Sequence, residues 1–376
     1  MTDCMTDGEN KAYLCSQLIT YLGNKRALLD FIGEAVRVVQ KRLNTDKLRF
    51  FDVFSGSGIV SRYFKKNASL LIANDLELYS RIINTCYLSN TAERDMVELR
   101  GLFCFLKERL DDCEFSGTWT RGIISTLYAP QDDTHIQKHE RVFYTGRNAA
   151  YVDTARALIE NMPPHARPFF IAPLLAEASV HVNTGGVFKG FYKNRETGIG
   201  QFGGKKRDAL SRITGNIDLD FPVFSKYDCE THVYTEDANT LVFSVPETDI
   251  AYVDPPYNTH PYGSNYFMLN VIAEHKMPLH VSTVSGIPSD WNRSVYNKAK
   301  QAPKALLELI ENLKAKFVLL SFNSEGFMSK DELIKQLEKK GTLRIFESQY
   351  NTFRAGRNLK KRNIHISEYL FLLEKK

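Results

Sequence analysis

A strand, a glycine-rich turn, a helix and a second strand follow one another early in the chain. Residues 48–54 form an apolar run that predicts the first strand, and residues 69–73 (SLLIA) predict the second. Between them, the turn Ser55-Gly56-Ser57-Gly58 leads into a predicted helix over 59–66. This order is the first βαβ unit of a doubly wound parallel sheet, so we expect an α/β fold with a Rossmann-like sheet.

Further elements extend this unit on both sides. Residues 21–45 predict a helix behind the turn Gly23-Asn24, because their apolar residues recur at helical spacing. After a long interval the strand signals resume, and a helix and two late strands finish the chain. The expected elements are strands at 231–235, 248–253 and 316–322, a helix at 329–339, and strands at 343–350 and 364–373.

The middle of the chain is less regular. From about 105 to 230, prolines, glycines and basic-aromatic patches interrupt the pattern, and only short helical pieces such as 152–161 stand out. We therefore predict one catalytic α/β domain built from 15–104 and 231–376. A mostly helical or irregular insertion, residues 105–230, interrupts it.

The turn after the first predicted strand suits an adenosine-type ligand. Gly56 and Gly58 allow the backbone to approach a ligand closely. Ser61 stands where a dinucleotide-binding motif has its third glycine, but Asp75 lies 17 residues after Gly58, where a carboxylate can accept hydrogen bonds from ribose hydroxyls. A plain helix-capping turn and a NAD-dependent dehydrogenase both stay compatible with this unit alone.

A sharper motif, Asp254-Pro255-Pro256-Tyr257-Asn258, follows the strand predicted at 248–253. The prolines fix φ and remove two amide donors, so the segment presents carbonyl oxygens. Asp254 adds a carboxylate, which in its ionised form accepts hydrogen bonds and donates none. Together these acceptors can hold both protons of an aromatic NH₂ group and make its nitrogen nucleophilic. Tyr257 offers a flat face for a base that has left the duplex. A surface turn is the alternative for this motif taken alone.

Four motifs in order resemble the Dam-type DNA adenine methyltransferases. They are Tyr21-Leu22-Gly23-Asn24-Lys25, the glycine turn, the long insertion and D-P-P-Y, which is the order of that family's alpha group. The resemblance covers about 20–370, and the methyltransferases of FokI-like restriction systems are the branch that the chain most resembles. It implies a class I methyltransferase sheet, S-adenosylmethionine as cofactor, double-stranded DNA as substrate, and target recognition by residues 105–230. It leaves open a cognate restriction endonuclease as a partner.

The same resemblance implies roles for individual residues. Asp254, Pro255, Pro256 and Tyr257 would be catalytic. The expected cofactor site combines the first motif, the glycine turn and acidic residues that follow strands. Its members are Tyr21, Lys25, Asp52, Phe54, Gly56, Gly58, Asp75, Asp237 and Asp254.

Several alternatives remain at this point. Carbon methylation of cytosine needs a thiolate from a Pro-Cys dipeptide, which this chain lacks. The D-P-P-Y spelling resembles adenine enzymes, but its acceptor chemistry also serves the cytosine amine. A methyltransferase acting on RNA, or a catalytically inactive DNA-binding protein, is also compatible with the fold.

Two basic stretches are candidates for DNA contact, because Lys and Arg can neutralise phosphates. The first, residues 188–212, interleaves basic and aromatic residues, and the second, residues 354–362, separates the last two predicted strands. A solvated surface is the alternative for each. The residues that we expect to contact DNA are Lys189, Lys193, Arg195, Lys205, Lys206, Arg207, Arg354 and Arg357.

Composition adds only broad limits. The net charge of +5 permits a polyanionic partner. The six cysteines include no C-x-x-C pair and the nine histidines form no ligand-spaced cluster, so we expect no metal and a reducing, cytoplasmic location. No apolar run is long enough for a membrane span, so we expect no membrane partner.

Overall fold

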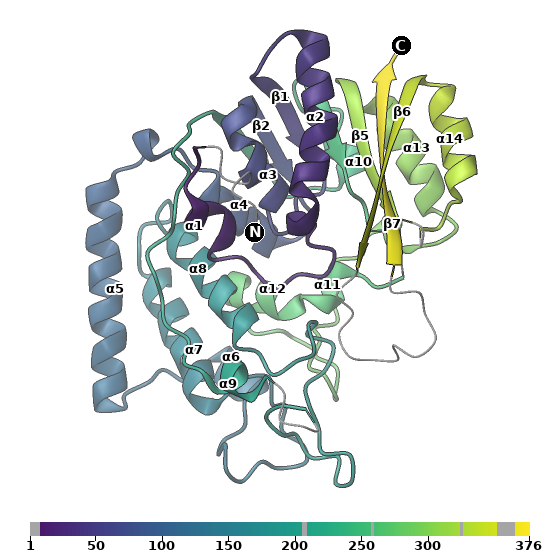
Figure 1. The fold of residues 1–376 in the computed structure, drawn as a ribbon. Helices are drawn as coiled ribbons and strands as arrows, with labels where there is room; N and C mark the ends of the chain where they lie inside the picture. The colour runs from purple at the N-terminus through teal and green to yellow at the C-terminus, as the bar shows by residue number, and fades with distance from the viewer. Residues whose placement is uncertain (1–7, 205–208, 257–258, 324–325, 352–364) are drawn as a thin grey trace.

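Seven strands form one sheet in the order β3-β2-β1-β4-β5-β7-β6 in a computed structural model. Figure 1 shows β1 and β2 in one part of this sheet and β5, β6 and β7 in another. The structure describes residues 8–204, 209–256, 259–323, 326–351 and 365–376. Within these ranges, no helix combines the length and the apolar composition that a membrane span requires. The strands are β1 (Leu48–Asp52), β2 (Ala68–Asn74), β3 (Glu230–Tyr234), β4 (Thr248–Val253), β5 (Ala315–Asn323), β6 (Gly341–Asn351) and β7 (His365–Lys375).

The pairing of these strands is that of a mostly parallel, doubly wound sheet. β3, β2, β1, β4 and β5 pair in parallel, whereas β7 runs antiparallel between β5 and β6. All seven predicted strands are present, with ends that differ by a few residues. The strand predicted at 48–54 already ends at Asp52, because the chain turns after the Val53 amide donates to the Tyr252 carbonyl.

Helices cover both faces of the sheet, which buries alternate side chains of each strand on opposite sides. Phe50 of β1 belongs to one apolar core, and Phe51 belongs to the other. The first core includes α2 (Leu29–Leu43), α3 (Ile59–Phe64) and α4 (Leu78–Tyr87). The second includes α10 (Ala238–Leu241), α13 (Ala302–Asn312) and α14 (Lys330–Glu338).

The helix α14 illustrates how local sequence fixes an element. Its cap, Ser329, accepts a hydrogen bond from the Glu332 amide at 3.2 Å, so the S-x-x-E spacing starts the helix one residue inside the predicted range of 329–339. Leu333 and Leu337, four residues apart, then face the second core.

The middle segment is more regularly helical than the sequence predicts. The 21-residue α5 begins before residue 105 and therefore crosses the predicted domain boundary. α8 was not expected as a helix, because its continuous apolar run has no helical period and contains Pro173. It packs against α4 and α12 and shares the first core with the catalytic half. The helices of the middle segment are α5 (Met96–Ser116), α6 (Ile123–Leu127), α7 (Gly146–Glu160), α8 (Arg167–Val180) and α9 (Leu210–Thr214). Outside this segment, α11 (Tyr262–Asn265) and α12 (Phe267–Glu274) follow β4.

A buried arginine fastens the N-terminal segment to the first βαβ unit. Arg62 of α3 is almost fully buried, and its guanidinium lies 3.6 Å from the centre of the Tyr87 ring. It donates to the carbonyl oxygens of Tyr13, within α1 (Lys11–Cys15), and of Ser16, directly after this helix. The last carbonyls of a helix lack partners of their own within it, so Arg62 can satisfy them and hold the chain that leads to Tyr21 and η2 (Lys25–Leu28).

Candidate active site

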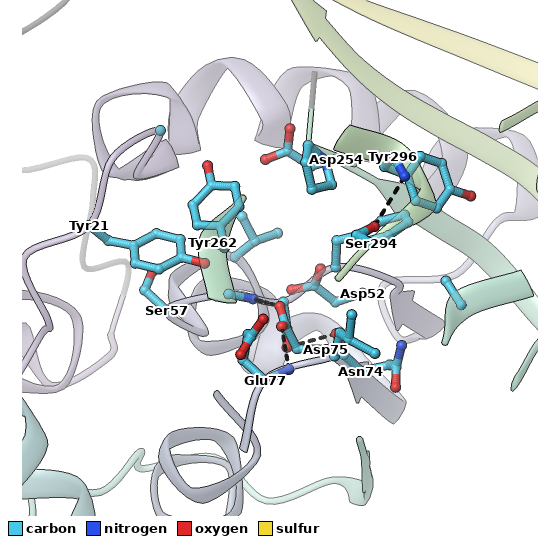
Figure 2. Close-up of a pocket in the computed structure, with 18 of the residues that line it drawn as sticks. Tyr21, Asp52, Ser57, Asn74, Asp75, Glu77, Asp254, Tyr262, Ser294 and Tyr296 are labelled. Carbon is cyan, nitrogen blue, oxygen red and sulfur yellow. Dashed lines mark hydrogen bonds between the residues drawn. The ribbon is translucent and has the colours of Figure 1, made fainter. Parts of the chain in front are cut away.

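The carboxyl ends of three neighbouring strands bring three aspartates to one pocket. Asp52 ends β1, while Asp75 and Asp254 directly follow β2 and β4. All three line a pocket of about 900 Å³, open solvent at its mouth included (Figure 2). Pockets of this size accommodate a small molecule, and the carboxyl edge of a parallel sheet is where such folds bind ligands.

The glycine turn approaches this pocket with only one of its two glycines. The Gly56 amide donates to the Asp75 Oδ2 at 2.8 Å, and a Cβ at Gly56 would lie 3.0 Å from the Tyr21 ring. Gly58 adopts φ +75°, and a Cβ there would lie 2.5 Å from Asn84 Oδ1. Of the described residues, Gly56 lines the pocket and Gly58 does not. Gly58 therefore serves the turn and its packing against α4, rather than the pocket wall.

The carboxyl groups in this pocket bind protons more tightly than carboxyls in water. Burial raises the pKa of Asp52 to about 7, although a hydrogen bond from the Ser61 hydroxyl to Asp52 Oδ2 at 2.7 Å opposes the shift. Burial also raises the pKa of Asp75 to about 6, against hydrogen bonds from the Glu77 and Gly56 amides. Low-dielectric surroundings favour the neutral acid unless a positive charge is nearby. The pocket therefore favours a cationic ligand.

Glu77, which the sequence analysis did not select, is a third acid of this wall. Its buried carboxylate accepts hydrogen bonds from Asn270 at 2.6 Å and Asn292 at 3.1 Å. Burial, followed by the Asp75 charge, raises its pKa to about 7. Its position two residues after Asp75 is the one sequence signal that could have identified it.

A stack of tyrosines holds the first motif against the pocket. The ring of Tyr21 stacks on Tyr266 with 4.6 Å between ring centres and on Tyr262 with 5.0 Å. The Tyr262 hydroxyl donates to the Leu22 carbonyl at 3.1 Å. Figure 2 shows Tyr21 and Tyr262 on one side of the pocket and Tyr296 on the other. The predicted cofactor residue Tyr21 therefore lies in the pocket wall, with its orientation fixed by α11 and the residue after it.

The opposite wall of the pocket contains some residues that the sequence motifs identified and others that they did not. Asp237 lines the pocket, but its exposed carboxylate also accepts from the Asn239 amide as the cap of α10. Phe54 meets Tyr296 edge to face at 5.0 Å between ring centres. The segment 292–297 after α12 supplies further lining residues that no motif indicated. These are Asn292, Ser294, Tyr296 and Asn297.

The D-P-P-Y segment joins the pocket at its β4 side. Asp254 has a side chain that is 16% exposed, and its Oδ1 lies 3.3 Å from Lys25 Nζ. Pro256 lines the pocket and Pro255 is buried. Tyr257 lies outside the described residues. The structure thus brings the predicted cofactor residues, apart from Gly58, into one site with Asp254.

The residues predicted to contact DNA are only partly described. One loop exposes three of them, Lys189, Lys193 and Arg195. An isolated antiparallel bridge between Lys193 and Gly200 joins the two sides of this loop. The Phe188 amide donates to the Asn265 carbonyl at 2.7 Å, which ties the base of this loop to α11. The other predicted contacts lie outside the described residues; they are Lys205, Lys206, Arg207, Arg354 and Arg357.

Comparison with known proteins identifies the family of this chain. The family model of the D12 class N6 adenine-specific DNA methyltransferases matches residues 21–284, which is more than half of the chain. The chain belongs to this family. The match begins at Tyr21 and includes the glycine turn, Asp75 and the D-P-P-Y motif. It confirms the predicted resemblance and favours adenine in DNA over the cytosine amine or RNA.

Relatives of this D12 methyltransferase are modification enzymes from bacteria and a virus. Type II methyltransferase M.NlaIII of Neisseria lactamica is 29% identical, covering 95% of this chain and 99% of the relative. M.CviAII of Paramecium bursaria Chlorella virus 1 is 28% identical, covering 94% and 98%. M.FokI of Planomicrobium okeanokoites is 27% identical over 94% of this chain, which spans only 52% of that relative. The D12 methyltransferase is therefore an adenine-specific DNA methyltransferase of the kind found in restriction-modification systems.

The raised pKa of Glu77 predicts a specific pH dependence of stability in this D12 methyltransferase. Between its ordinary value of 4.5 and about 7, the folded carboxyl keeps a proton that the unfolded chain has lost. Wild-type stability therefore falls as pH rises through this window. Relative to Glu77→Gln, the free energy of unfolding of the wild type should fall by about 3 kcal/mol between about pH 5 and pH 8, measured by urea denaturation.

The Gln side chain can itself destabilise the fold, because it lies beside the amides of Asn270 and Asn292. That effect on the free energy of unfolding does not depend on pH, so the difference between the two pH values removes it. The same exchange at Glu108, exposed on α5, is the control for a Glu-to-Gln change at the surface. Parallel pH profiles of the wild type and Glu77→Gln would show that the Glu77 carboxyl does not titrate in the pocket.

Proposed function

We propose that this methyltransferase transfers a methyl group from S-adenosylmethionine to N6 of a target adenine in double-stranded DNA. The observation that carries the proposal is the position of Asp254, at the carboxyl end of β4 and in the same pocket as Asp52 and Asp75. A methyl donor and an acceptor amine must meet within one site for a direct transfer, and this arrangement provides acceptors for both.

The pocket residues fit S-adenosylmethionine as the donor. When bound, the donor supplies an electrophilic methyl group on a cationic sulfur. Asp52 Oδ1 is buried and has no hydrogen-bond partner within the described part of the chain, so it can accept from the ammonium group of such a ligand. Asp75 supplies a carboxylate for the ribose hydroxyls, while Tyr21, Phe54 and Asp237 complete the wall.

Asp254 and the two prolines after it support adenine methylation without a covalent intermediate. Adenine must leave the duplex to reach a site at the edge of the sheet. The Asp254 carboxylate then accepts a hydrogen bond from the N6 amine and stabilises the positive charge that develops on nitrogen. As the N–methyl bond forms, the bond between sulfur and the methyl group would break, S-adenosylhomocysteine would leave, and the nitrogen would release one proton. The carbonyls of the Pro-containing segment provide further acceptors, and Tyr257 is the proposed stacking partner of the base.

We also propose that residues 105–230 form the target-recognition part, between the catalytic segments 15–104 and 231–376. The exposed Lys189 directly follows Phe188, which is buried against Tyr266, and Tyr266 stacks on the pocket residue Tyr21. DNA held by this loop would therefore lie near the mouth of the pocket. A cognate restriction endonuclease is the proposed functional partner, and the cytoplasm is the proposed location.

The first test replaces the proposed catalytic carboxylate. Asp254→Ala should reduce kcat for methyl transfer by at least about a hundredfold, because the interaction forms with the reacting amine. The measurement is incorporation of a radioactive methyl group into mixed-sequence DNA. Asp249→Ala is the matched control, since Asp249 lies on the same strand but at its other end, where it accepts from the Arg49 amide. An Asp254→Ala enzyme that kept more than about a tenth of the wild-type rate would contradict the assignment.

A second test addresses the cofactor site. Asp75→Ala should raise the dissociation constant of S-adenosylhomocysteine about tenfold to a hundredfold, because charge-assisted hydrogen bonds contribute roughly 1.5–3 kcal/mol. Isothermal titration calorimetry measures this, and DNA binding should remain close to that of the wild type. Unchanged affinity for S-adenosylhomocysteine would remove Asp75 from the cofactor site.

A third test concerns the basic loop. Replacement of Lys189, Lys193 and Arg195 by Ala should weaken DNA binding and make its log–log salt dependence shallower by up to about three units, one for each lost phosphate contact. A filter-binding series over several salt concentrations measures this slope. A triple variant of Lys335, Lys339 and Arg344 removes the same charges from exposed positions on α14, directly after α14 and on β6. If both triple variants change the slope equally, the loop does not contact DNA.

A further inference from the structure

We propose that Glu368, on the last strand of the sheet, is a positioning residue for methyl transfer. It holds the Lys25 ammonium beside Asp254 so that the ammonium supports the Asp254 charge without neutralising it. The inference rests on the proposed role of Asp254. It assigns a function to a residue outside the four motifs and beyond the segment that the family model matches.

The contacts of Lys25 are unequal. Its Nζ lies 2.5 Å from Glu368 Oε1 and 3.3 Å from Asp254 Oδ1. The Ser321 hydroxyl also donates to Glu368 Oε1, at 2.8 Å. Glu368 is therefore the nearer partner of the ammonium and is itself held by β5.

The sheet topology explains why these residues meet. β7 runs antiparallel beside β5, and Glu368 pairs with Asn323, the last residue of β5 (Figure 1). β4 pairs in parallel with β5 on its other side, so Asp254 emerges at the same edge. Lys25 begins η2, directly after the turn at Gly23 and Asn24. Three segments far apart in sequence thus place one ammonium between two carboxylates.

Burial strengthens the interaction between these charges. The side chains of Lys25 and Glu368 are 8% and 1% exposed, so neither charge is solvated well by water. Burial alone would lower the pKa of Lys25, but the Asp254 and Glu368 carboxylates raise it well above its ordinary value. Lys25 is therefore a cation at every working pH. One ammonium and two carboxylates together carry one net negative charge.

That net charge is what the proposed reaction requires. As the adenine amine attacks, positive charge develops on its nitrogen, and an anionic Asp254 stabilises it. If an uncharged side chain replaced Glu368, Asp254 would be the remaining carboxylate of the two described beside the ammonium and would form an ion pair with it. Asp254 would then be both neutralised and occupied as an acceptor. The loss would affect the chemical step rather than substrate binding.

Glu368→Gln tests this with nearly the same shape and no charge. We expect kcat for methyl transfer to fall at least about tenfold. KM for DNA, and the dissociation constant of S-adenosylhomocysteine from calorimetry, should each change less than about threefold. Glu374→Gln is the matched control, because it makes the same exchange on β7 at a partly exposed position next to Arg42. It should leave all three quantities unchanged.

A double-mutant cycle with Lys25→Met separates positioning from a general structural effect. If Glu368 acts through Lys25, adding Glu368→Gln to Lys25→Met should reduce kcat by less than about twofold. A wild-type kcat in Glu368→Gln, an equal loss in both backgrounds, or a loss confined to KM would overturn the proposal.

Two further measurements keep the result interpretable. If thermal unfolding shows that Glu368→Gln does not fold, Glu368→Asp keeps the charge but withdraws it by one methylene. It should lower kcat with KM preserved, and an unchanged kcat would contradict the proposal. Wild-type enzyme assayed in parallel distinguishes the two levels of inference, because an inactive wild type would refute the proposed function and not the role of Glu368 alone.

Discussion

Backbone hydrogen bonds between β1 and its two parallel neighbours, β2 and β4, determine where the carboxylates of the site lie. The register pairs Asp52 with Ala73 on one side and with Tyr252 on the other. The chain therefore leaves β2 and β4 at the level of Asp52, and Asp75 and Asp254 emerge at one edge. A shift of register by one residue would turn these side chains to the other face of the sheet or move them along the edge.

Several acidic side chains lie close together at this buried edge of the sheet, which makes their ionisation unfavourable, and a cationic ligand can offset this effect. Asp52, Asp75 and Glu77 all have raised pKa values, because burial disfavours the ionised form of each. A cationic methyl donor bound among them would favour ionisation and so couple binding to proton release. At the neighbouring end of β4, Lys25 Nζ lies 3.3 Å from Asp254 Oδ1, so this carboxylate already has a positive charge of the protein beside it.

Sequence patterns were sufficient for the sheet and for the motifs at its edge. The strands were predictable because short apolar runs end at polar residues, and Asp254 was identified because a D-P-P-Y segment follows such a run. α8 was not predictable, because a mostly buried helix with a continuous apolar run has no apolar period to detect. Glu368 and Asn292 could not be found either. Their roles depend on the pairing of distant strands and on how a loop folds back, neither of which leaves a local signal.

The nature of the methylated atom tests the central claim most directly. Wild-type enzyme would be incubated with S-adenosylmethionine and unmethylated double-stranded DNA of mixed sequence. The DNA would then be digested to nucleosides and analysed by liquid chromatography and mass spectrometry. The account predicts N6-methyldeoxyadenosine as the methylated product, at a level that depends on enzyme and donor. Methylation of the cytosine amine, or no methylated nucleoside from a folded enzyme that binds S-adenosylhomocysteine, would contradict it.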